Sequence, residues 1–364
     1  MSQGKFEKKP VEKRQKETGS VQPEKPAKKG KLWVKILIAV IVVILVLAVA
    51  AFATVNHYLN KLGSFDDPDQ TMDTTPITDE FDTDSTIAGQ ETIETMDPTD
   101  VTFDEVEALA SDDIVNIMLI GQDVRPGEGR SRSDTMLLVT LNPGKNAIQM
   151  TSFMRDTYVQ IPGYLDNRLN VAYRYGGTDL MNATFLKNFG IEIDGNVMVD
   201  FTEFAHIIDQ LGGVDIDLSA EETDYMIDRG CTVTQGMNHL NGEDALTFVR
   251  MRYVSGGDYG RTERQRRVIT SLIDSFRDAS LKEILALVDE LLPRVVTNVS
   301  NTDILKYAAT GVSLLADKAE VQSLRIPADD AHYGTMIDGM SVLVPDLKMC
   351  REDLEEFIYS TPAE

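Results

Sequence analysis

The longest apolar run in the chain covers residues 36–55, which are almost all Ile, Val, Leu and Ala. The run contains no charged residue, and Thr54 is its only polar side chain. An α-helix rises ~1.5 Å per residue, so such a run spans ~30 Å, the thickness of the hydrocarbon core of a bilayer. Trp33 and Tyr58 flank it at positions typical of interfacial aromatic residues. The pattern predicts a single transmembrane helix over residues 33–57.

After residue 112, shorter apolar runs alternate with segments of helical periodicity. The runs at 114–121, 135–141 and 147–153 are predicted to be buried strands, and an Asn-Pro-Gly-Lys turn joins the last two. Helices are predicted at 179–189, 201–211, 243–251, 261–277, 281–292, 303–316 and 346–359. Further strands are predicted at 197–199, 214–218 and 321–326. We expect the α/β fold class, as a three-layer α/β/α sandwich whose early hairpin makes the central sheet mixed.

Charge divides the chain into four parts within an overall net charge of -24. Residues 1–32 are rich in Lys and poor in large apolar side chains, which predicts a disordered basic tail. The transmembrane helix follows, and residues 58–112 then form an acidic linker. No Lys or Arg occurs between Gly63 and Val124. Residues 113–364 remain for one domain, a length that can bury a sizeable core.

Lysines precede the apolar run and acidic residues follow it, so the positive-inside rule places the N-terminus in the cytoplasm. The chain is therefore predicted to be a single-pass type II membrane protein with its domain outside the cell. A cleaved signal peptide is the alternative, although the apolar run is longer than a usual signal sequence contains. Cys231 and Cys350 would both lie outside, and the sequence leaves open whether they form a disulfide or remain free thiols.

Arginine is concentrated in one short part of this acidic chain. Six arginines fall within eighteen residues: Arg250, Arg252, Arg261, Arg264, Arg266 and Arg267. Guanidinium is planar, permanently charged and matched to phosphate oxygens, so the cluster predicts a pocket for a concentrated anion. Helical spacing puts Arg261, Arg264 and Gln265 on one face. The alternative is a solvated basic helix face. Nucleic-acid binding is disfavoured by the acidic net charge and the extracellular placement.

Carboxylates and a further arginine lie at predicted strand ends. Asp123 follows the first strand and Asp134 precedes the second, so the two meet at one sheet edge if those strands are neighbours. Two carboxylates among phosphate-binding arginines suit Mg²⁺ (or Mn²⁺), which takes one or two protein carboxylates and substrate oxygens. In the alternative interpretation, Asp123 and Asp134 are ordinary turn and cap residues that form salt bridges with Arg125 and Arg132. Arg155 follows the third strand, where a surface ion pair with Asp156 is the alternative.

Several common catalytic motifs are missing from the sequence. It contains no GxSxG, HExxH, P-loop or GxGxxG motif, and its four histidines (His57, His206, His239 and His332) are scattered. These absences give little support to a Ser–His hydrolase or a zinc site.

Taken in order, several segments resemble the LytR-CpsA-Psr family of bacterial cell-wall glycopolymer ligases. They are residues 116–125 (NIMLIGQDVR), 132–135 (RSDT), 152–158 (SFMRDTY), 168–173 (RLNVAY), 175–177 (YGG), 211–215 (LGGVD), 240–246 (LNGEDAL), 250–252 (RMR) and 257–266 (GDYGRTERQR). Each segment alone is weak evidence for the resemblance, but the whole set, in this order along the chain, is highly specific to the family. Two positions depart from the usual pattern: Arg168 stands where Lys is common, and Met154 where Pro is usual.

The resemblance implies transfer of a glycopolymer, such as a teichoic acid or capsular chain, from a polyprenyl-pyrophosphate carrier to a peptidoglycan hydroxyl. By position, Asp123 and Asp134 correspond to metal-binding carboxylates. Pyrophosphate contacts correspond to Arg132, Arg155, Arg250, Arg252, Arg261 and Gln265. The catalytic set implied is Asp134, Arg155 and Asp123, and whether Asp134 or Asp123 is the base or only a metal ligand stays open.

Two other functions remain consistent with these residues. A polyprenyl-pyrophosphate pyrophosphatase or phosphotransferase would use the same groups without a glycan acceptor. A non-catalytic, membrane-anchored regulator would bind anionic wall polymer through the arginines and would not need Asp123 or Asp134. The products formed from a lipid-linked glycan distinguish the three.

Overall fold

The computed structural model describes residues 63–64, 95–103, 107–109, 111, 113–122, 133–252, 254, 256–278 and 296–360. The predicted basic tail, transmembrane helix and most of the acidic linker lie outside these residues. So do the predicted helix at 281–292 and the site candidates Asp123 and Arg132. Among the described helices, none is long and apolar enough to span a bilayer.

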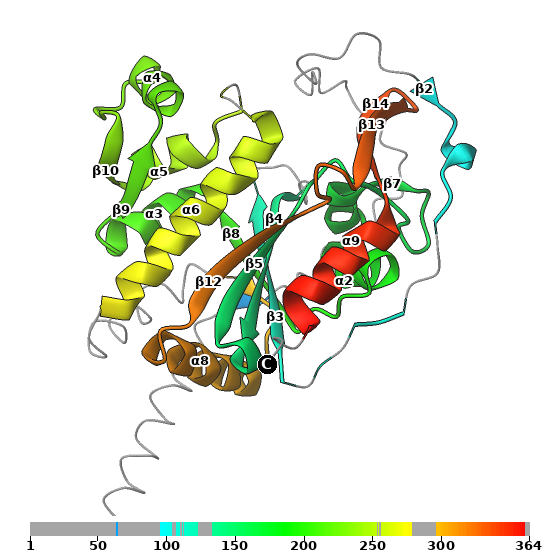
Figure 1. The fold of residues 1–364 in the computed structure, drawn as a ribbon, viewed down its shortest axis with the longest axis horizontal. Coiled ribbons are helices and arrows are strands. Elements are labelled where there is room, and N and C mark those ends of the chain that lie inside the picture. Colours follow the sequence, from blue (N-terminus) through cyan, green and yellow to red (C-terminus); the bar gives the residue numbers. More distant parts are fainter. Residues whose placement is uncertain are drawn as a thin grey trace, which may run out of the picture. The chain divides into compact units, whose positions relative to one another are not determined.

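A seven-stranded sheet forms the centre of the fold (Figure 1). Its strands, in spatial order, are β1 (Gly63–Ser64), β11 (Val296–Thr297), β8 (Gly195–Asp200), β3 (Val115–Gln122), β4 (Ser133–Asn142), β5 (Ala147–Phe153) and β12 (Glu320–Ile326). The pairs β3–β4, β4–β5 and β11–β8 are antiparallel. The pairs β1–β11, β3–β8 and β12–β5 are parallel. The prediction of a mixed sheet is confirmed, and β3 and β4, which precede and follow the segment 123–132, are direct neighbours.

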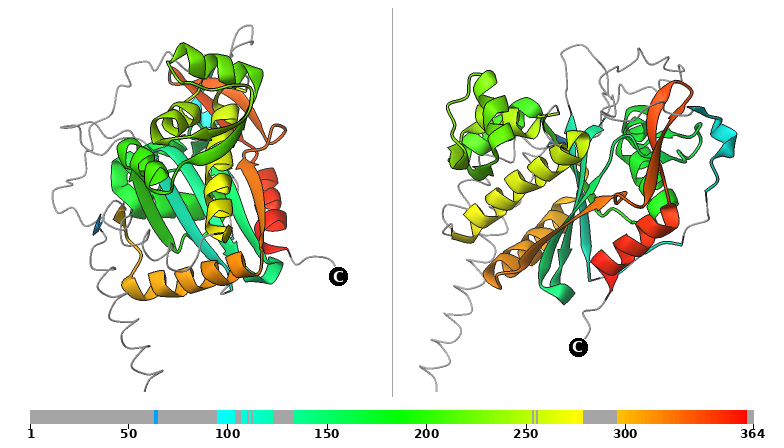
Figure 2. Two further views of the ribbon diagram at one scale, coloured as in Figure 1. Left: turned by 90° about the vertical axis from the view of Figure 1, so that its left-hand side faces the viewer. Right: turned by 45° about the horizontal axis from the view of Figure 1, so that its top comes forward.

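Helices cover both faces of this sheet (Figures 1 and 2). α2 (Leu169–Phe189) and α9 (Leu347–Leu354) lie on one face, and α6 (Gly257–Asp278) and α8 (Asn301–Ala316) on the other. Alternation along β3 separates the two cores, because successive strand side chains point to opposite faces. Met118 and Ile120 pack with Phe185 of α2, whereas Val115 packs with residues of α8.

Five further elements form a lobe beside α6 with its own apolar core. They are α3 (Phe201–Gln210), β9 (Val214–Leu218), α4 (Ala220–Asp228), β10 (Gly236–Leu240) and α5 (Gly242–Val249). β9 and β10 pair antiparallel. α4 was not predicted, since its sequence, rich in acidic residues, has little apolar periodicity. The signal that could have revealed it is the capping box between Ser219 and Glu222.

The two cysteines lie in different cores, and both are free. Cys231 packs against the core of the lobe, whereas Cys350 of α9 is buried in the core beneath α2. The disulfide alternative is therefore excluded in this structure. Burial is the main cause that raises the pKa of Cys231 to about 11 and of Cys350 to about 12.

A smaller set of strands packs beside the main sheet. β13 (His332–Ile337) pairs with β14 (Met340–Pro345) and with β2 (Thr95–Met96), and β6 (Tyr158–Val159) pairs with β7 (Asn167–Arg168). Two short helical turns, η1 (Pro98–Asp100) and η2 (Pro143–Lys145), and the π-helical turn η4 (Glu355–Tyr359) complete the described elements. The β13–β14 hairpin was not predicted, although Asp338-Gly339, both at positive φ, is a strong hairpin signal.

Two helix starts differ from the sequence prediction. α2 covers Leu169–Phe189, but Gly176 and Gly177 have non-helical φ/ψ and divide it in two. The predicted helix at 179–189 is its second part, and the first part, from Leu169, was not predicted. α6 begins at Gly257, so Asp258 and Tyr259 are helical where a loop was predicted. At the start of α6, nearby glycines had suggested a loop, but Gly257 begins the helix.

Replacing Gly242 by alanine is expected to lower the free energy of unfolding by about 1–3 kcal/mol. Gly242 opens α5 against α3, and a Cβ there would overlap the carbonyl oxygen of Ala205. The matched control is Gly311→Ala in α8, where the added Cβ meets only Leu141 Cδ1 at 4.0 Å. That change is expected to be neutral or stabilising because alanine favours the helix. Urea unfolding measures both, and equal effects would contradict the packing argument.

Candidate active site

The chain leaving β5 is tied to three other parts of the fold. Met154 N–H donates to Ile326 O, Asn170 N–H to Arg155 O, and Leu343 N–H to Asp156 O. These backbone bonds fix the position of the Arg155-Asp156 pair beside the end of the sheet. Both side chains are buried, with Arg155 8% and Asp156 9% exposed.

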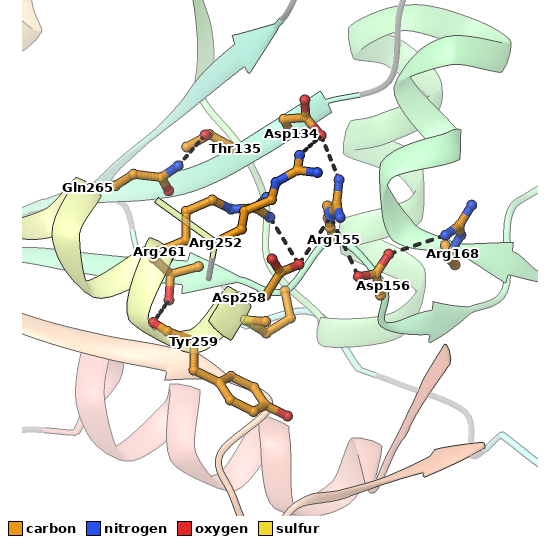
Figure 3. Close-up of polar contacts among 12 residues, drawn as sticks. Asp134, Thr135, Arg155, Asp156, Arg168, Arg252, Asp258, Tyr259, Arg261 and Gln265 are labelled. Carbon is orange, nitrogen blue, oxygen red and sulfur yellow. Dashed lines mark hydrogen bonds and ion pairs between the residues drawn. The ribbon is translucent and has the colours of Figure 1, made fainter. Parts of the chain in front are cut away.

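Three carboxylates surround the guanidinium of Arg155 (Figure 3). Its Nη1 donates to Asp134 Oδ1 at 2.9 Å and its Nε to Asp258 Oδ2 at 3.2 Å. Asp156 Oδ2 lies 3.5 Å from the same Nε. Burial lowers the pKa of Arg155, but the three carboxylates, Asp156 first, outweigh it and raise the pKa overall. The structure therefore holds a permanent, oriented cation at the end of β5.

Asp258 joins Arg155 to the first turn of α6. Arg261, one turn later, donates from Nη2 to the same Oδ2 of Asp258 at 3.2 Å. Arg261 is 5% exposed, and its Nε has no hydrogen-bond partner within the described part of the chain. Burial lowers its pKa, although Asp258 opposes that effect. A buried, incompletely satisfied guanidinium is a group to which an anion would bind.

Asp134 and Arg252 form the more accessible part of the group. Arg252 Nη2 lies 4.0 Å from Asp134 Oδ1, and the two side chains are 30% and 24% exposed. Gln265, on the third turn of α6, donates to Thr135 Oγ1 at 2.8 Å. β4, the end of β5, α6 and the segment after α5 thus bring Asp134, Arg155, Arg252 and Arg261 together, as Figure 3 shows.

The other arginines of the sequence cluster have different partners, so the structure does not bring all six to one place. Arg264 Nε and Arg267 Nη1 both donate to Glu222 Oε1 of α4 at 2.8 Å. Arg266 donates to Ser152 Oγ at 2.8 Å, and Arg250 is exposed with its guanidinium carbon 4.8 Å from the ring centroid of Phe201. Arg261, Arg264 and Gln265 do lie in one helix at the predicted spacing. Their side chains bind different partners, however: Arg261 binds Asp258, Arg264 binds Glu222 and Gln265 binds Thr135.

Asp258 is the residue of this group to which the sequence analysis gave no role. It lies within the segment 257–266, but three nearby glycines placed it in a predicted loop. Its signal was an acidic residue three positions before Arg261, the spacing of a helical ion pair.

A second buried ion pair, between Arg168 and Asp156, lies next to Arg155. Arg168 Nη1 donates to Asp156 Oδ1 at 3.4 Å, so Asp156 lies between Arg155 and Arg168. Burial raises the pKa of Asp156 and the two arginines oppose that rise. The Arg at position 168, where the family pattern often has Lys, therefore supplies the same positive charge to Asp156.

Among the described residues, no group of three or more His, Cys, Asp or Glu side chains could hold a metal by itself. Asp134 is described and offers a partly exposed carboxylate, whereas Asp123 lies outside the described residues. A hard cation that takes one or two protein carboxylates and several ligand oxygens is compatible with this donor set.

The chain matches the model of the LytR_cpsA_psr family over residues 77–356. This protein belongs to the LytR_cpsA_psr family. The polyisoprenyl-teichoic acid–peptidoglycan teichoic acid transferase TagU of Bacillus mycoides is 34% identical over 230 residues, which are 62% of this chain and 72% of TagU. The regulatory protein MsrR of Staphylococcus aureus is 31% identical over 240 residues, 64% of this chain and 71% of MsrR.

The fold agrees with that assignment. A solved structure of TagT bound to LIIa-WTA has 25% sequence identity and a TM-score of 0.58, covering 70% of this chain and 96% of TagT. All the described site residues of this LytR_cpsA_psr protein lie inside the matched segment 77–356. The roles assigned to them remain predictions.

Proposed function

We propose that this LytR_cpsA_psr protein is a transferase that moves a glycopolymer from a polyprenyl-pyrophosphate carrier to a peptidoglycan hydroxyl. The observation that carries the proposal is the buried Arg155–Asp258–Arg261 arrangement beside the accessible Asp134 and Arg252. Fixed guanidinium groups at one place suit a pyrophosphate better than a neutral sugar. The name of TagU, which is similar to this chain, states the same donor and acceptor classes.

The transfer proposed is of the phosphotransferase type. The acceptor oxygen forms a bond to the glycan-bearing phosphorus, the pyrophosphate P–O bond breaks, and the lipid leaves as its monophosphate. Negative charge grows on the departing phosphate, and Arg155, Arg252 and Arg261 would stabilise it. Arg155 and Arg261 need little reorganisation, because Asp134 and Asp258 already orient them.

The proton of the acceptor hydroxyl needs a base. Asp134 is the described candidate, since it is partly exposed and its Oδ1 is the atom that faces Arg155 and Arg252. Asp123 is the other candidate from the sequence. Asp134 and Asp123 would also hold Mg²⁺ (or Mn²⁺), which when bound neutralises phosphate charge.

Omission of divalent cations is expected to lower transfer by at least tenfold, since the proposed ion neutralises charge that grows during the reaction. The full chain, purified in detergent, is incubated with a polyprenyl-pyrophosphate-linked oligosaccharide and a peptidoglycan oligomer, with Mg²⁺ or EDTA. Mass spectrometry follows the glycan–peptidoglycan adduct. Asp134→Asn is expected to give low transfer in both conditions, whereas the exposed Asp224→Asn should keep the response to Mg²⁺.

Three outcomes of this experiment have different meanings. A Mg²⁺-dependent adduct supports the transferase. Phosphate release without an adduct favours a pyrophosphatase. Binding without any product favours a wall-polymer-binding regulator, a reading to which the name of MsrR lends weight.

The proposed location follows from the sequence outside the described residues. One anchor over residues 33–57 would hold the chain in the cell membrane, with a cytoplasmic N-terminus and the domain on the cell-wall side. The membrane, the lipid-linked glycan and peptidoglycan are then its partners, and no nucleic acid is required. Protease accessibility of the domain in intact cells tests this orientation.

A further inference from the structure

The first turn of α6 carries Asp258, but the chain that enters this turn constrains it weakly. Gly256 and Gly257 have φ values of 91° and 52°, which glycine adopts readily. Gly257 N–H donates to Val254 O at 3.1 Å and Gly260 N–H to Gly256 O at 3.0 Å, so these backbone bonds stay within the turn. These backbone bonds do not tie Asp258 to the rest of the fold, so side chains that hold the turn from outside contribute to its position beside the contacts of the helix that follows.

The hydroxyl group of Tyr259 ties the first turn of α6 to another part of the fold. Its Oη lies 2.6 Å from Nε2 of His332, at the start of β13, and Nδ1 of His332 lies 2.7 Å from Ala328 O. A carbonyl only accepts, so in the neutral imidazole Nδ1 carries the proton and Nε2 accepts from the tyrosine O–H. Burial is the largest cause that raises the pKa of Tyr259, which keeps its hydroxyl protonated.

The ring of Tyr259 is held on its face as well. The guanidinium carbon of Arg325, in β12, lies 4.2 Å from the ring centroid, a cation–π distance. Arg325 is itself bound by Asp329 Oδ1 at 2.5 Å and Pro327 O at 3.3 Å. Figure 3 shows the Tyr259 side chain pointing away from Arg155 and Asp134, so it anchors the turn without entering the arginine group.

We infer that Tyr259 and His332 are positioning residues for pyrophosphate recognition: their hydrogen bond fixes the first turn of α6, and through it the carboxylate of Asp258 that orients Arg155 and Arg261. The inference deepens the proposed function and rests on it. Neither residue needs to touch the substrate. The segment 325–332, far along the chain from every sequence-predicted site residue, thereby sets the geometry of the arginines.

The first test removes the hydrogen bond and keeps the ring. Tyr259→Phe in the full chain, in detergent, is expected to bind geranylgeranyl pyrophosphate about fivefold more weakly by calorimetry, the usual effect of one lost buried hydrogen bond. Transfer should fall by a similar factor. Tyr333→Phe is the matched control, because Tyr333 is 49% exposed and, within the part of the chain that the structure describes, its hydroxyl donates to Met96 Sδ alone, at 3.5 Å. Unchanged affinity and transfer in Tyr259→Phe would overturn the inference.

The second test separates hydrogen bonding from general stability. His332→Leu should behave like Tyr259→Phe, whereas His332→Gln should recover most of the affinity, since its amide oxygen can accept where Nε2 did. Thermal unfolding checks that each variant is folded. If Tyr259→Phe fails to fold, the Leu and Gln pair still decides the question. Equal loss in both His332 variants would contradict a role for the hydrogen bond.

The third test asks whether Tyr259 acts through Asp258. Asp258→Asn and Tyr259→Phe are measured alone and together, and the double variant is expected to be no weaker than Asp258→Asn. Independent effects that multiply would overturn the inference. Absence of transfer by the wild-type chain would instead count against the proposed function. The pyrophosphate affinities would still test positioning, because they require no transfer.

Discussion

Arg155→Ala is expected to transfer glycopolymer about 10²–10³-fold more slowly than the wild-type chain. Arg155 is buried, is oriented by Asp134 and Asp258 within 3.2 Å, and lies beside Asp156. A group held in this way stabilises growing phosphate charge without first rearranging. Its loss also leaves three carboxylates without their shared cation, which would repel the substrate.

The Arg155→Lys variant distinguishes charge from geometry. Lysine keeps the positive charge but cannot donate to Asp134 and Asp258 at once from the ends of a planar group. We therefore expect it to remain at least tenfold slower than wild type. The measurement is the initial rate of adduct formation by mass spectrometry, with circular dichroism to confirm folding. Arg229→Ala, which removes an exposed arginine stacked over Tyr225, is the control. Near-wild-type transfer by Arg155→Ala would refute the assignment of Arg155.

Glu222→Ala is expected to lower the free energy of unfolding by ~3–5 kcal/mol. Glu222 is 5% exposed and accepts hydrogen bonds from Arg264, Arg267 and the backbone N–H of Ser219. Removing it leaves the buried guanidinium of Arg264, which is 3% exposed, without its carboxylate, and also breaks the capping box of α4. Urea unfolding gives the free-energy difference. Glu221→Ala, an exposed change of the same charge in the same helical turn, should cost far less.

The contribution of Glu222 to the free energy of unfolding is also expected to depend on pH. Burial raises the pKa of Glu222, but hydrogen bonds from Ser219 and Arg267 outweigh it, and the net pKa lies below its ordinary value of 4.5. A carboxyl with a lowered pKa in the folded state stabilises the fold above its ordinary pKa. The advantage of wild type over Glu222→Gln should therefore be full at neutral pH, shrink as the pH falls below about 4.5, and vanish below the folded-state pKa. An advantage that grew on acidification would contradict this linkage.

The sequence predicted the central strands well because each is a short apolar run between clear turn residues. β5 has the predicted bounds, residues 147–153, and β3 and β4 differ from their predictions by one or two residues at each end. Elements that lack an apolar run bounded by turn residues were not predicted. Four of the nine residues of α4 are acidic, and the β13–β14 hairpin alternates weakly, so their apolar patterns carry little information about burial.

For the candidate site, the sequence identified most of the residue types but not their partners. Asp134, Arg155, Arg252 and Arg261 were named from strand ends and the arginine cluster, and the structure brings these four together. Spacing alone could not show that Glu222 binds Arg264 and Arg267, since Glu222 lies on an unpredicted helix. It also could not give Asp258 its bridging position, because three glycines there favour a loop as readily as a helix start.

By itself, the sequence determined the family, the mixed α/β sheet and the permanent positive charge near the end of β5, because these follow from residue type, periodicity and ordered motifs. The tertiary structure alone decided which arginines share Asp258 with Arg155, which are bound by Glu222, and how His332 reaches Tyr259. The reason is physical: the pairing of buried charges depends on which oxygen atoms lie within about 3 Å. Residues forty to a hundred positions apart come that close only when the sheet, the lobe and α6 have packed.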